Sequence, residues 1–202
     1  MPLYLIRHGE TDDNHNKIVQ LPTSPLSALG REQVSLLAKR FAGIAVSKII
    51  TSDYLRAQQT AQALAQMQDC GVIVSDLLRE RNFGDIRGQS YDEIDDDFHG
   101  PNYIPVNGES YAQFTQRTAQ AWQFVLQQCE LYQDNIVVVS HGLVLRAWLK
   151  DQLRAPTESQ LAHAHFASTS VIEVDAKDRK TIIALCDVSH LADYEIVKGG
   201  IA

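Results

Sequence analysis

The sequence predicts an α/β fold, a single-domain three-layer sandwich in which a mostly parallel sheet carries helices on both faces. Short apolar runs alternate with longer amphipathic segments, as strands and crossover helices do in βαβ units. The clearest run, Ile136–Val139, is continuous and β-branched, which is typical of a parallel strand buried on both faces. No internal repeat and no linker divides the 202 residues, so we expect one domain over 1–202.

The elements are expected in a regular order. A short strand at Tyr4–Ile6 precedes a polar loop from Thr11 to Ser27, and Ser27 is the expected N-cap of a helix that stops near Gly43. The later elements are strand Lys48–Thr51, helix Tyr54–Gln68 capped by Ser52 and Asp53, strand Val72–Val74, helix Ser110–Tyr132, strand Ile136–Val139, helix Leu143–Leu153, and strands Ser170–Val174 and Thr181–Leu185. The acidic, glycine-containing region 83–109 is predicted to be a solvated loop with short helical pieces that covers the substrate, rather than a metal site.

Composition excludes several classes of protein. The formal net charge of -7 argues against nucleic acid or an anionic membrane as a partner. No run approaches the ~18 apolar residues of a membrane helix, and no signal peptide is recognisable. Cys70, Cys129 and Cys186 are widely spaced, which suggests reduced thiols instead of a disulfide framework or a zinc site. We therefore expect a cytoplasmic protein, and the sequence does not indicate its oligomeric state.

Charged and imidazole side chains follow four of the expected strands. In chain order these side chains are Arg7 and His8, then Arg56, Glu80 and His141. Because the carboxyl ends of parallel strands meet at one edge of a sheet, we expect the five side chains to converge there. Burying unpaired charges is costly, and one anionic ligand would explain the whole set.

The residue types suit phosphoryl transfer from a phosphomonoester. Such esters hydrolyse so slowly that roughly 20 orders of magnitude of acceleration are needed. The His8 imidazole keeps a neutral, nucleophilic form at pH 7, and nearby Arg7 and Arg56 favour that form further. Arginine donates two parallel hydrogen bonds to phosphate, and helix N-termini at Arg56 and Gly142 add free N–H groups. Glu80 is the candidate acid for the leaving alkoxide. Bound phosphate would raise its pKa, and the flanking Arg79 and Arg81 would lower it if their side chains pointed the same way.

Four stretches in this order resemble the histidine phosphatase superfamily and its phosphoglycerate mutase-like branch: Leu5–Thr11, Thr51–Ala61, Leu78–Glu80 and Val139–Gly142. The resemblance implies that His8 becomes phosphorylated, that Glu80 donates the proton, and that His141 holds the phosphoryl oxygens. It also implies that Asn14 contacts phosphate. The catalytic set is thus predicted as His8, Glu80, His141, Arg7 and Arg56, and the phosphate-binding set as Arg7, Asn14, Arg56, His141 and Gly142.

Two positions depart from the family pattern. Gln20-Leu21-Pro22 lacks the glycine often found after the asparagine, so the entrance to the site is expected to differ there. Arg87 replaces one residue of a common aromatic–acidic pair, and it is either a reader of a second anionic group on the substrate or a surface cation.

Structural alternatives exist for three of the predicted site residues. Arg56 is a possible ion-pair partner of Asp53, and Glu80 of Arg79 or Arg81. Asn14 is a possible turn residue that bonds its own backbone.

The predicted function is hydrolysis of a small phosphorylated metabolite through a phosphohistidine. A cofactor-dependent phosphoglycerate mutase is the alternative, although such mutases generally carry a longer insertion after the acid residue, and here only about thirty residues separate Glu80 from the helix at Ser110. A non-catalytic binder of phosphorylated ligands or phosphoproteins is the third hypothesis. No cofactor and no metal are expected, because no carboxylate cluster has bimetallic spacing and His163 and His165 lack a third ligand.

Overall fold

The computed structural model describes residues 2–94, 97–132, 134–154 and 167–192, and these residues form one six-stranded sheet. Its strands, in the spatial order β3-β2-β4-β1-β5-β6, are β1 (Leu3–Arg7), β2 (Val46–Ser52), β3 (Gly71–Ser75), β4 (Asn135–Ser140), β5 (Val171–Val174) and β6 (Ile182–Asp187). The first four strands in that order pair in parallel, whereas β5 is antiparallel to both β1 and β6. The predicted mostly parallel sheet is confirmed, with β5 as the one reversed strand within the described ranges.

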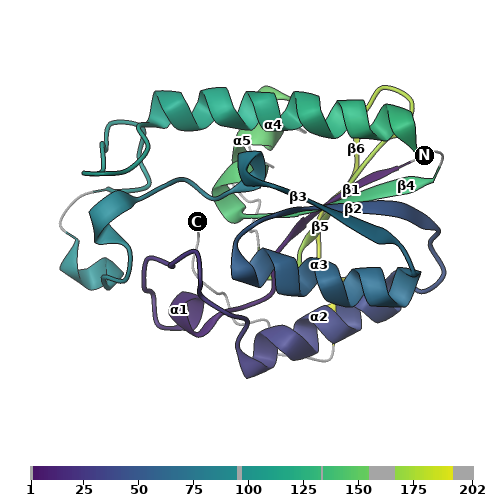
Figure 1. The fold of residues 1–202 in the computed structure, drawn as a ribbon, viewed down its shortest axis with the longest axis horizontal. Coiled ribbons are helices and arrows are strands. Elements are labelled where there is room, and N and C mark those ends of the chain that lie inside the picture. Colours follow the sequence, from purple (N-terminus) through teal and green to yellow (C-terminus); the bar gives the residue numbers. More distant parts are fainter. Residues whose placement is uncertain (1, 95–96, 133, 155–166, 193–202) are drawn as a thin grey trace.

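Two pairs of helices cover the two faces of the sheet (Figure 1). The pair α2 (Ala28–Arg40) and α3 (Leu55–Gln68) packs on one face, and α4 (Tyr111–Leu131) and α5 (Gly142–Asp151) pack on the other. Alternate residues of a strand point to opposite faces. Leu5 of β1 accordingly joins the core beneath α4 and α5, while its neighbour Ile6 joins the core beneath α2 and α3. A central strand of this sheet must therefore be apolar at every position, which explains the continuous run in β4.

Local structure departs from the sequence prediction at three places. A short helix, α1 (Asp12–His15), lies within the predicted loop 11–27, and the Thr11 hydroxyl caps it by accepting from the Asn14 N–H. The N-cap of α3 is Tyr54, which makes no side-chain capping bond, so the expected capping by Ser52 and Asp53 is wrong. Finally, α2 ends at Arg40, before Gly43, although Ser27 is its N-cap as expected.

Short 3-10 helices link the sheet to the region that follows β3. These are η1 (Asp76–Leu78), η2 (Gly84–Ile86) and η3 (Tyr91–Glu93), and a fourth, η4 (Ser189–Leu191), follows β6. In Figure 1 the segment after η1 extends to the left of the sheet, beyond the carboxyl ends of the parallel strands. The predicted short helical pieces are thus present in the described part of 83–109.

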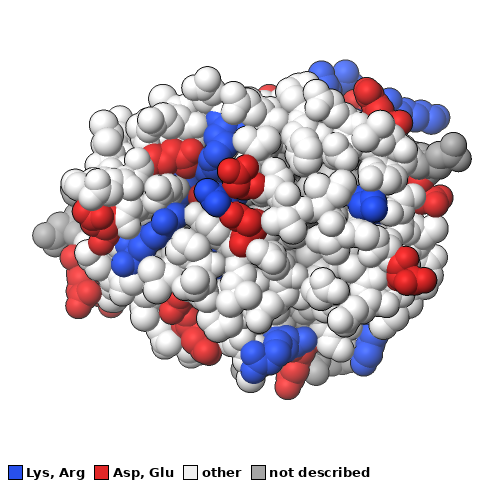
Figure 2. All heavy atoms as spheres, in the orientation of Figure 1, with Lys and Arg blue, Asp and Glu red and all other residues white. Residues whose placement is uncertain are grey.

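The register of β1 and β4 determines which side chains meet at this edge. Arg7 lies opposite Ser140 in the parallel pairing of β1 and β4, so the residues that follow them, His8 and His141, leave the sheet side by side. The space-filling view shows basic and acidic side chains gathered left of centre on the face drawn, while most of the right half is uncharged (Figure 2).

The start of α2 packs directly against the backbone that follows the first histidine. Ser27 donates from its N–H to the carbonyl oxygen of Glu10 at 2.9 Å, and its hydroxyl donates to the Glu10 carboxylate at 3.0 Å. One helical turn later, a Cβ atom on Gly30 would lie 2.0 Å from the Glu10 carbonyl oxygen. Glycine at position 30 therefore permits a contact that a side chain would prevent.

We expect Gly30→Ala to destabilise the fold by roughly 1–3 kcal/mol, because the added methyl group forces the backbone of α2 away from Glu10. Gly43→Ala is the matched control, since a Cβ atom there meets nothing within 4 Å. Urea denaturation of the two variants measures the difference. Equal stability of the two variants would show that α2 is free to shift at this contact.

Candidate active site

The two histidines lie together in the interior of the protein. The exposed fraction is 1% for His8 and 0% for His141, and their ring centroids are 5.1 Å apart. They come from the loop after β1 and from the N-cap of α5, and the register of the two strands brings them together. The sequence prediction that these residues converge is consistent with this geometry.

Hydrogen bonds fix the tautomer of His8. Its Nδ1 lies 2.7 Å from the carbonyl oxygen of Gly9, which can only accept, so Nδ1 carries the proton. Its Nε2 then has the lone pair, and Arg56 Nε donates a hydrogen bond to it at 3.1 Å. Burial lowers the pKa of His8 well below its ordinary value, and the charges of Arg56 and Arg7 lower it further. The ring is therefore neutral, with Nε2 basic and turned toward a guanidinium.

Two buried arginines surround the imidazoles, because Arg7 and Arg56 are each only 1% exposed. Arg56 donates from Nη1 to the carbonyl oxygen of Leu21 at 2.9 Å, and its guanidinium lies over the Tyr54 ring. Burial lowers the pKa of Arg56 to about 10, while Glu80 opposes this shift. The alternative partner considered for Arg56, Asp53, instead binds Arg79.

Glu80 is held by backbone N–H groups. Its carboxylate accepts from the N–H of Arg81 at 3.0 Å and from the N–H of Leu143, in the first turn of α5, at 3.1 Å. Burial raises the pKa of Glu80, and these two bonds and the charges of Arg56 and Arg7 partly oppose the rise. The guanidinium groups of Arg79 and Arg81 do not bind the Glu80 carboxylate, because Arg79 binds Asp53 and Arg81 binds backbone carbonyl oxygens. Burial lowers the pKa of Arg81, and the charge of Glu80 nevertheless acts to raise it.

His141 has buried nitrogens without a hydrogen-bond partner among the described residues. Both Nδ1 and Nε2 are in this condition, and burial lowers the pKa of His141 well below its ordinary value. The ring packs between His8 and Tyr54, whose centroids lie 5.1 and 5.3 Å away. A buried polar atom without a partner is rare in proteins, so these nitrogens are available to hydrogen-bond a ligand or a water molecule.

The remaining predicted site residues are Asn14 and Gly142. Asn14 is buried in α1, where its recorded side-chain contact is with Thr11, and the described geometry does not join it to either histidine. Gly142 is buried as the first residue of α5. His163 and His165, like the segment beyond Ala192, lie outside the described residues.

Sequence reasoning missed several residues around this cluster. Tyr54 is 6% exposed and packs edge-on against His141, although its sequence neighbours suggested only a helix start. Arg117 of α4 donates to the carbonyl oxygens of Leu77 and Arg79 at 2.8 Å each and so fixes the backbone next to Glu80. The buried Arg81 donates to carbonyl oxygens of Gly100, Tyr103 and Glu109. No local sequence signal distinguishes these arginines from surface ones.

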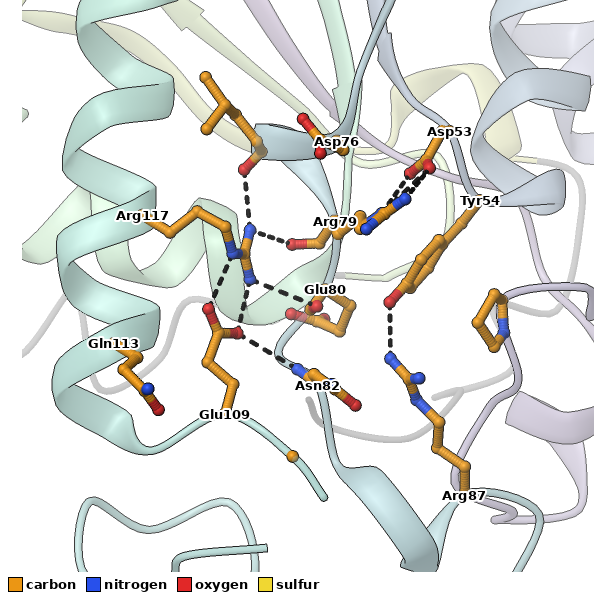
Figure 3. A pocket seen from close by; sticks show the side chains of 13 residues that line it. Asp53, Tyr54, Asp76, Arg79, Glu80, Asn82, Arg87, Glu109, Gln113 and Arg117 are labelled. Carbon is orange, nitrogen blue, oxygen red and sulfur yellow. Dashed lines mark hydrogen bonds and ion pairs between the residues drawn. The ribbon is translucent and has the colours of Figure 1, made fainter. Parts of the chain in front are cut away.

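Two cavities adjoin each other at the cluster, and they share Tyr54, Glu80 and Arg87. The inner cavity, of about 30 Å³, is lined by Val19, Gln20, Tyr54, Arg56, Glu80, Arg81, Phe83, Arg87, Tyr91, Phe98, His99 and Leu143. The outer cavity, of about 520 Å³, is lined by Pro22, Asp53, Tyr54, Asp76, Leu77, Arg79, Glu80, Asn82, Arg87, Gly108, Glu109, Gln113 and Arg117 (Figure 3). The arrangement offers a small, cationic inner site that opens into a larger polar one.

The described residues contain neither a metal-binding cluster nor a membrane-spanning helix. No group of three or more His, Cys, Asp or Glu side chains within the described ranges is placed to hold a metal ion. Among the same residues, none of the helices has the length and apolarity needed to cross a membrane.

The chain is similar to known proteins in both sequence and structure. Residues 3–188 match the model of the histidine phosphatase superfamily (branch 1). A probable phosphoglycerate mutase GpmB from Enterobacter sp. is 28% identical over 95% of each chain. The structure resembles the alpha-ribazole phosphatase of Shigella flexneri, with 27% identity, a TM-score of 0.79 and coverage of 93% of this chain and 97% of that one. It also resembles a mycobacterial glucosyl-3-phosphoglycerate phosphatase in complex with VO3, with 26% identity, a TM-score of 0.72 and coverage of 90% and 94%.

The lowered pKa of His141 predicts a dependence of stability on pH. The unfolded chain has a histidine pKa near 6.5, so as the pH falls it binds the proton before the folded protein does, and unfolding becomes easier. Between pH 7.5 and 5.5 this histidine should account for a loss on the order of 1 kcal/mol in the free energy of unfolding, because its pKa in the folded protein is lowered by burial. Urea titrations at both pH values should show His141→Gln losing less by that amount, and His15→Gln, at an exposed position, is the control. An unchanged loss in His141→Gln would mean that His141 is protonated in the folded state.

Proposed function

Because the chain belongs to the histidine phosphatase superfamily, we propose that it hydrolyses phosphomonoesters of small metabolites through a phosphohistidine formed on His8. The observation that carries the proposal is the pair of contacts made by His8, from Nδ1 to the carbonyl oxygen of Gly9 and from Nε2 to Nε of Arg56. These contacts place the proton on Nδ1 and leave Nε2 basic. A nucleophile at phosphorus needs that lone pair at neutral pH. Arg7, Arg56 and His141 are proposed to hold the phosphoryl oxygens, together with Gly142 and Asn14.

In the first half-reaction, His8 Nε2 forms a bond to phosphorus while the bond from phosphorus to the leaving oxygen breaks. Protonated Glu80 gives its proton to that oxygen, so the product leaves as a neutral alcohol and Glu80 becomes a carboxylate. Burial raises the pKa of Glu80, and a bound phosphate dianion raises it further, which favours the protonated acid in the complex. The arginines stabilise the charge on the phosphoryl oxygens during the transfer.

In the second half-reaction, a water molecule gives its proton to the Glu80 carboxylate and attacks phosphorus. The bond from Nε2 to phosphorus breaks, inorganic phosphate is formed, and His8 and Glu80 return to their starting states. His8 is thus the nucleophile in the first half-reaction and the leaving group in the second, and Glu80 is first the general acid and then the general base.

We assign the region 83–109 as a cover for the substrate. Three aromatic side chains from this region, Phe83, Tyr91 and Phe98, pack together beside the inner cavity. Arg81 ties the far part of the region to its beginning through the carbonyl oxygens of Gly100 and Tyr103. A cover of this kind limits access of water to the inner site.

A phosphoglycerate mutase remains the second candidate, since several relatives from different bacteria are named as probable phosphoglycerate mutases. A mutase discharges the phosphohistidine to a second hydroxyl and must exclude water longer than a hydrolase does. Phosphate release that requires no 2,3-bisphosphoglycerate favours the hydrolase. Interconversion of phosphoglycerates that depends on this bisphosphate and outpaces hydrolysis would establish the mutase instead.

Replacing His8 with alanine should lower kcat for phosphate release by at least ~10³-fold, because the nucleophile is removed. Wild-type protein quenched during turnover of a labelled ester should carry acid-labile, alkali-stable phosphate, as a phosphohistidine does, and His8→Ala should carry none. His15→Ala, at an exposed position, is the matched control. A protein that only binds phosphorylated ligands would release phosphate in none of these forms, and chelator added to the wild type tests for a required metal.

Replacing Glu80 with glutamine tests proton donation to the leaving group. An alkyl phosphate has a strongly basic leaving oxygen, so its kcat should fall by roughly 10²–10⁴-fold. p-Nitrophenyl phosphate releases a stable phenolate and should lose far less. Glu109→Gln, in the same outer cavity, is the control and should affect both esters alike. Equal losses for the two esters in Glu80→Gln would show that Glu80 has another role.

A further inference from the structure

Three arginines line the outer cavity, and two of them are neutralised by carboxylates. Arg79 donates from Nε and Nη2 to the carboxylate of Asp53. Arg117 donates from Nε to Glu109 at 2.8 Å and from Nη2 to the same carboxylate at 2.7 Å. Figure 3 shows these two pairs on separate walls of the cavity.

The third arginine, Arg87, has a different kind of partner. Its Nη2 donates to the hydroxyl oxygen of Tyr54 at 2.6 Å, and no salt bridge to Arg87 is recorded within the described ranges. Burial raises the pKa of Tyr54, which keeps this hydroxyl neutral, so it orients the guanidinium without cancelling its charge.

The other carboxylates that the structure describes in this region do not pair with Arg87. Glu80 is held by two backbone N–H groups, and Asp85 accepts from the side-chain amide of Asn107. Asp76 lies at the opposite end of the cavity from Arg87 in Figure 3. A positive charge in a polar cavity with no anion beside it favours an anionic ligand.

Tyr54 also sets the distance between Arg87 and the phosphate-binding arginine. The guanidinium carbons of Arg56 and Arg87 lie 5.1 and 5.7 Å from the centroid of the Tyr54 ring. The two carbons are therefore no more than about 11 Å apart. One small molecule can span such a distance with a phosphate at one end and a second anionic group at the other.

We propose that Arg87, held by the hydroxyl of Tyr54, selects phosphomonoesters that carry a second anionic group, a carboxylate or another phosphate, a few atoms from the scissile ester. The inference rests on the proposed phosphatase function and specifies its substrate class. Arg87 contacts the far end of the substrate, while Arg56 and the histidines hold the phosphoryl group that is transferred. The arginine that departs from the family pattern thus becomes the residue that distinguishes substrates.

Paired substrates that differ only in the second anionic group test this inference. We expect the wild type to have a kcat/KM at least ~10-fold higher for phosphoserine than for phosphoethanolamine, or for fructose 1,6-bisphosphate than for fructose 6-phosphate, because the charge-assisted bond to Arg87 is lost in the second member of each pair. The first pair tests a carboxylate and the second a phosphate. Arg87→Gln should bring the preferred ratio close to one.

Two variants control for general effects. Arg87→Lys keeps the charge without the planar fork and should restore part of the ratio. Arg154→Gln removes an exposed arginine that pairs with Asp178 beyond the end of α5, and it should leave the ratio unchanged. Binding of each paired ester to His8→Ala, measured by calorimetry, provides the same ratio without turnover.

Three results are distinguishable. A wild-type ratio near one for both pairs, or a ratio that survives in Arg87→Gln, overturns the selection by Arg87 and leaves the phosphatase proposal intact. Turnover of none of the four esters, with no phosphate bound to His8, overturns the proposed function and this inference with it. A ratio that falls in Arg87→Gln for one pair only identifies whether carboxylate or phosphate is read.

Discussion

The geometry of the site depends on one hydrogen bond, from Nδ1 of His8 to the carbonyl oxygen of Gly9. Because that oxygen only accepts, the bond fixes the proton on Nδ1 and leaves Nε2 with its lone pair. A protonated ring would turn an N–H toward Arg56, so that two donors would face each other in a buried site. The neutral ring is the protonation state that this arrangement accommodates, in agreement with the lowered pKa of His8.

The burial that keeps the imidazole neutral also disfavours the charged forms of the neighbouring arginines and glutamate. Arg7 and Arg56 are buried almost completely, and Glu80 is the carboxylate whose charge supports both of them. Burial nevertheless raises the pKa of Glu80, so the anion that would compensate the arginines is itself disfavoured. An oxyanion ligand removes this conflict, because it supplies the negative charge and lets Glu80 take up a proton. Donors that are fixed before the ligand arrives need no reorganisation when charge develops on it.

The sequence predicted the strands that position this site, and the family motifs at their ends, more completely than the side chains that surround the histidines. Runs such as the one in β4 encode their own structure, since continuous β-branched residues suit a buried parallel strand, and the family to which the chain belongs was recognisable from short stretches at the strand ends. The roles of three further residues depend on which backbone group or ring they meet after folding; these are Arg81, Arg117 and Tyr54. No local sequence pattern predicts such contacts. The N-cap of α3 was misassigned for a related reason: Asp53 is a residue type that often caps helices, but its carboxylate binds Arg79.

The bond between Arg56 and His8 links phosphate binding to the readiness of the nucleophile. Arg56 Nε donates to the lone pair of His8 Nε2, and a nitrogen that accepts a hydrogen bond along its lone pair cannot attack phosphorus in that direction. A phosphate dianion competes for the same N–H, and a hydrogen bond from a guanidinium to an anionic oxygen is roughly twice as strong as one between neutral groups. Under the proposed function, the guanidinium therefore moves its bond from nitrogen to phosphate as the substrate enters. The step that binds the ester then also frees the lone pair of Nε2 for attack on phosphorus.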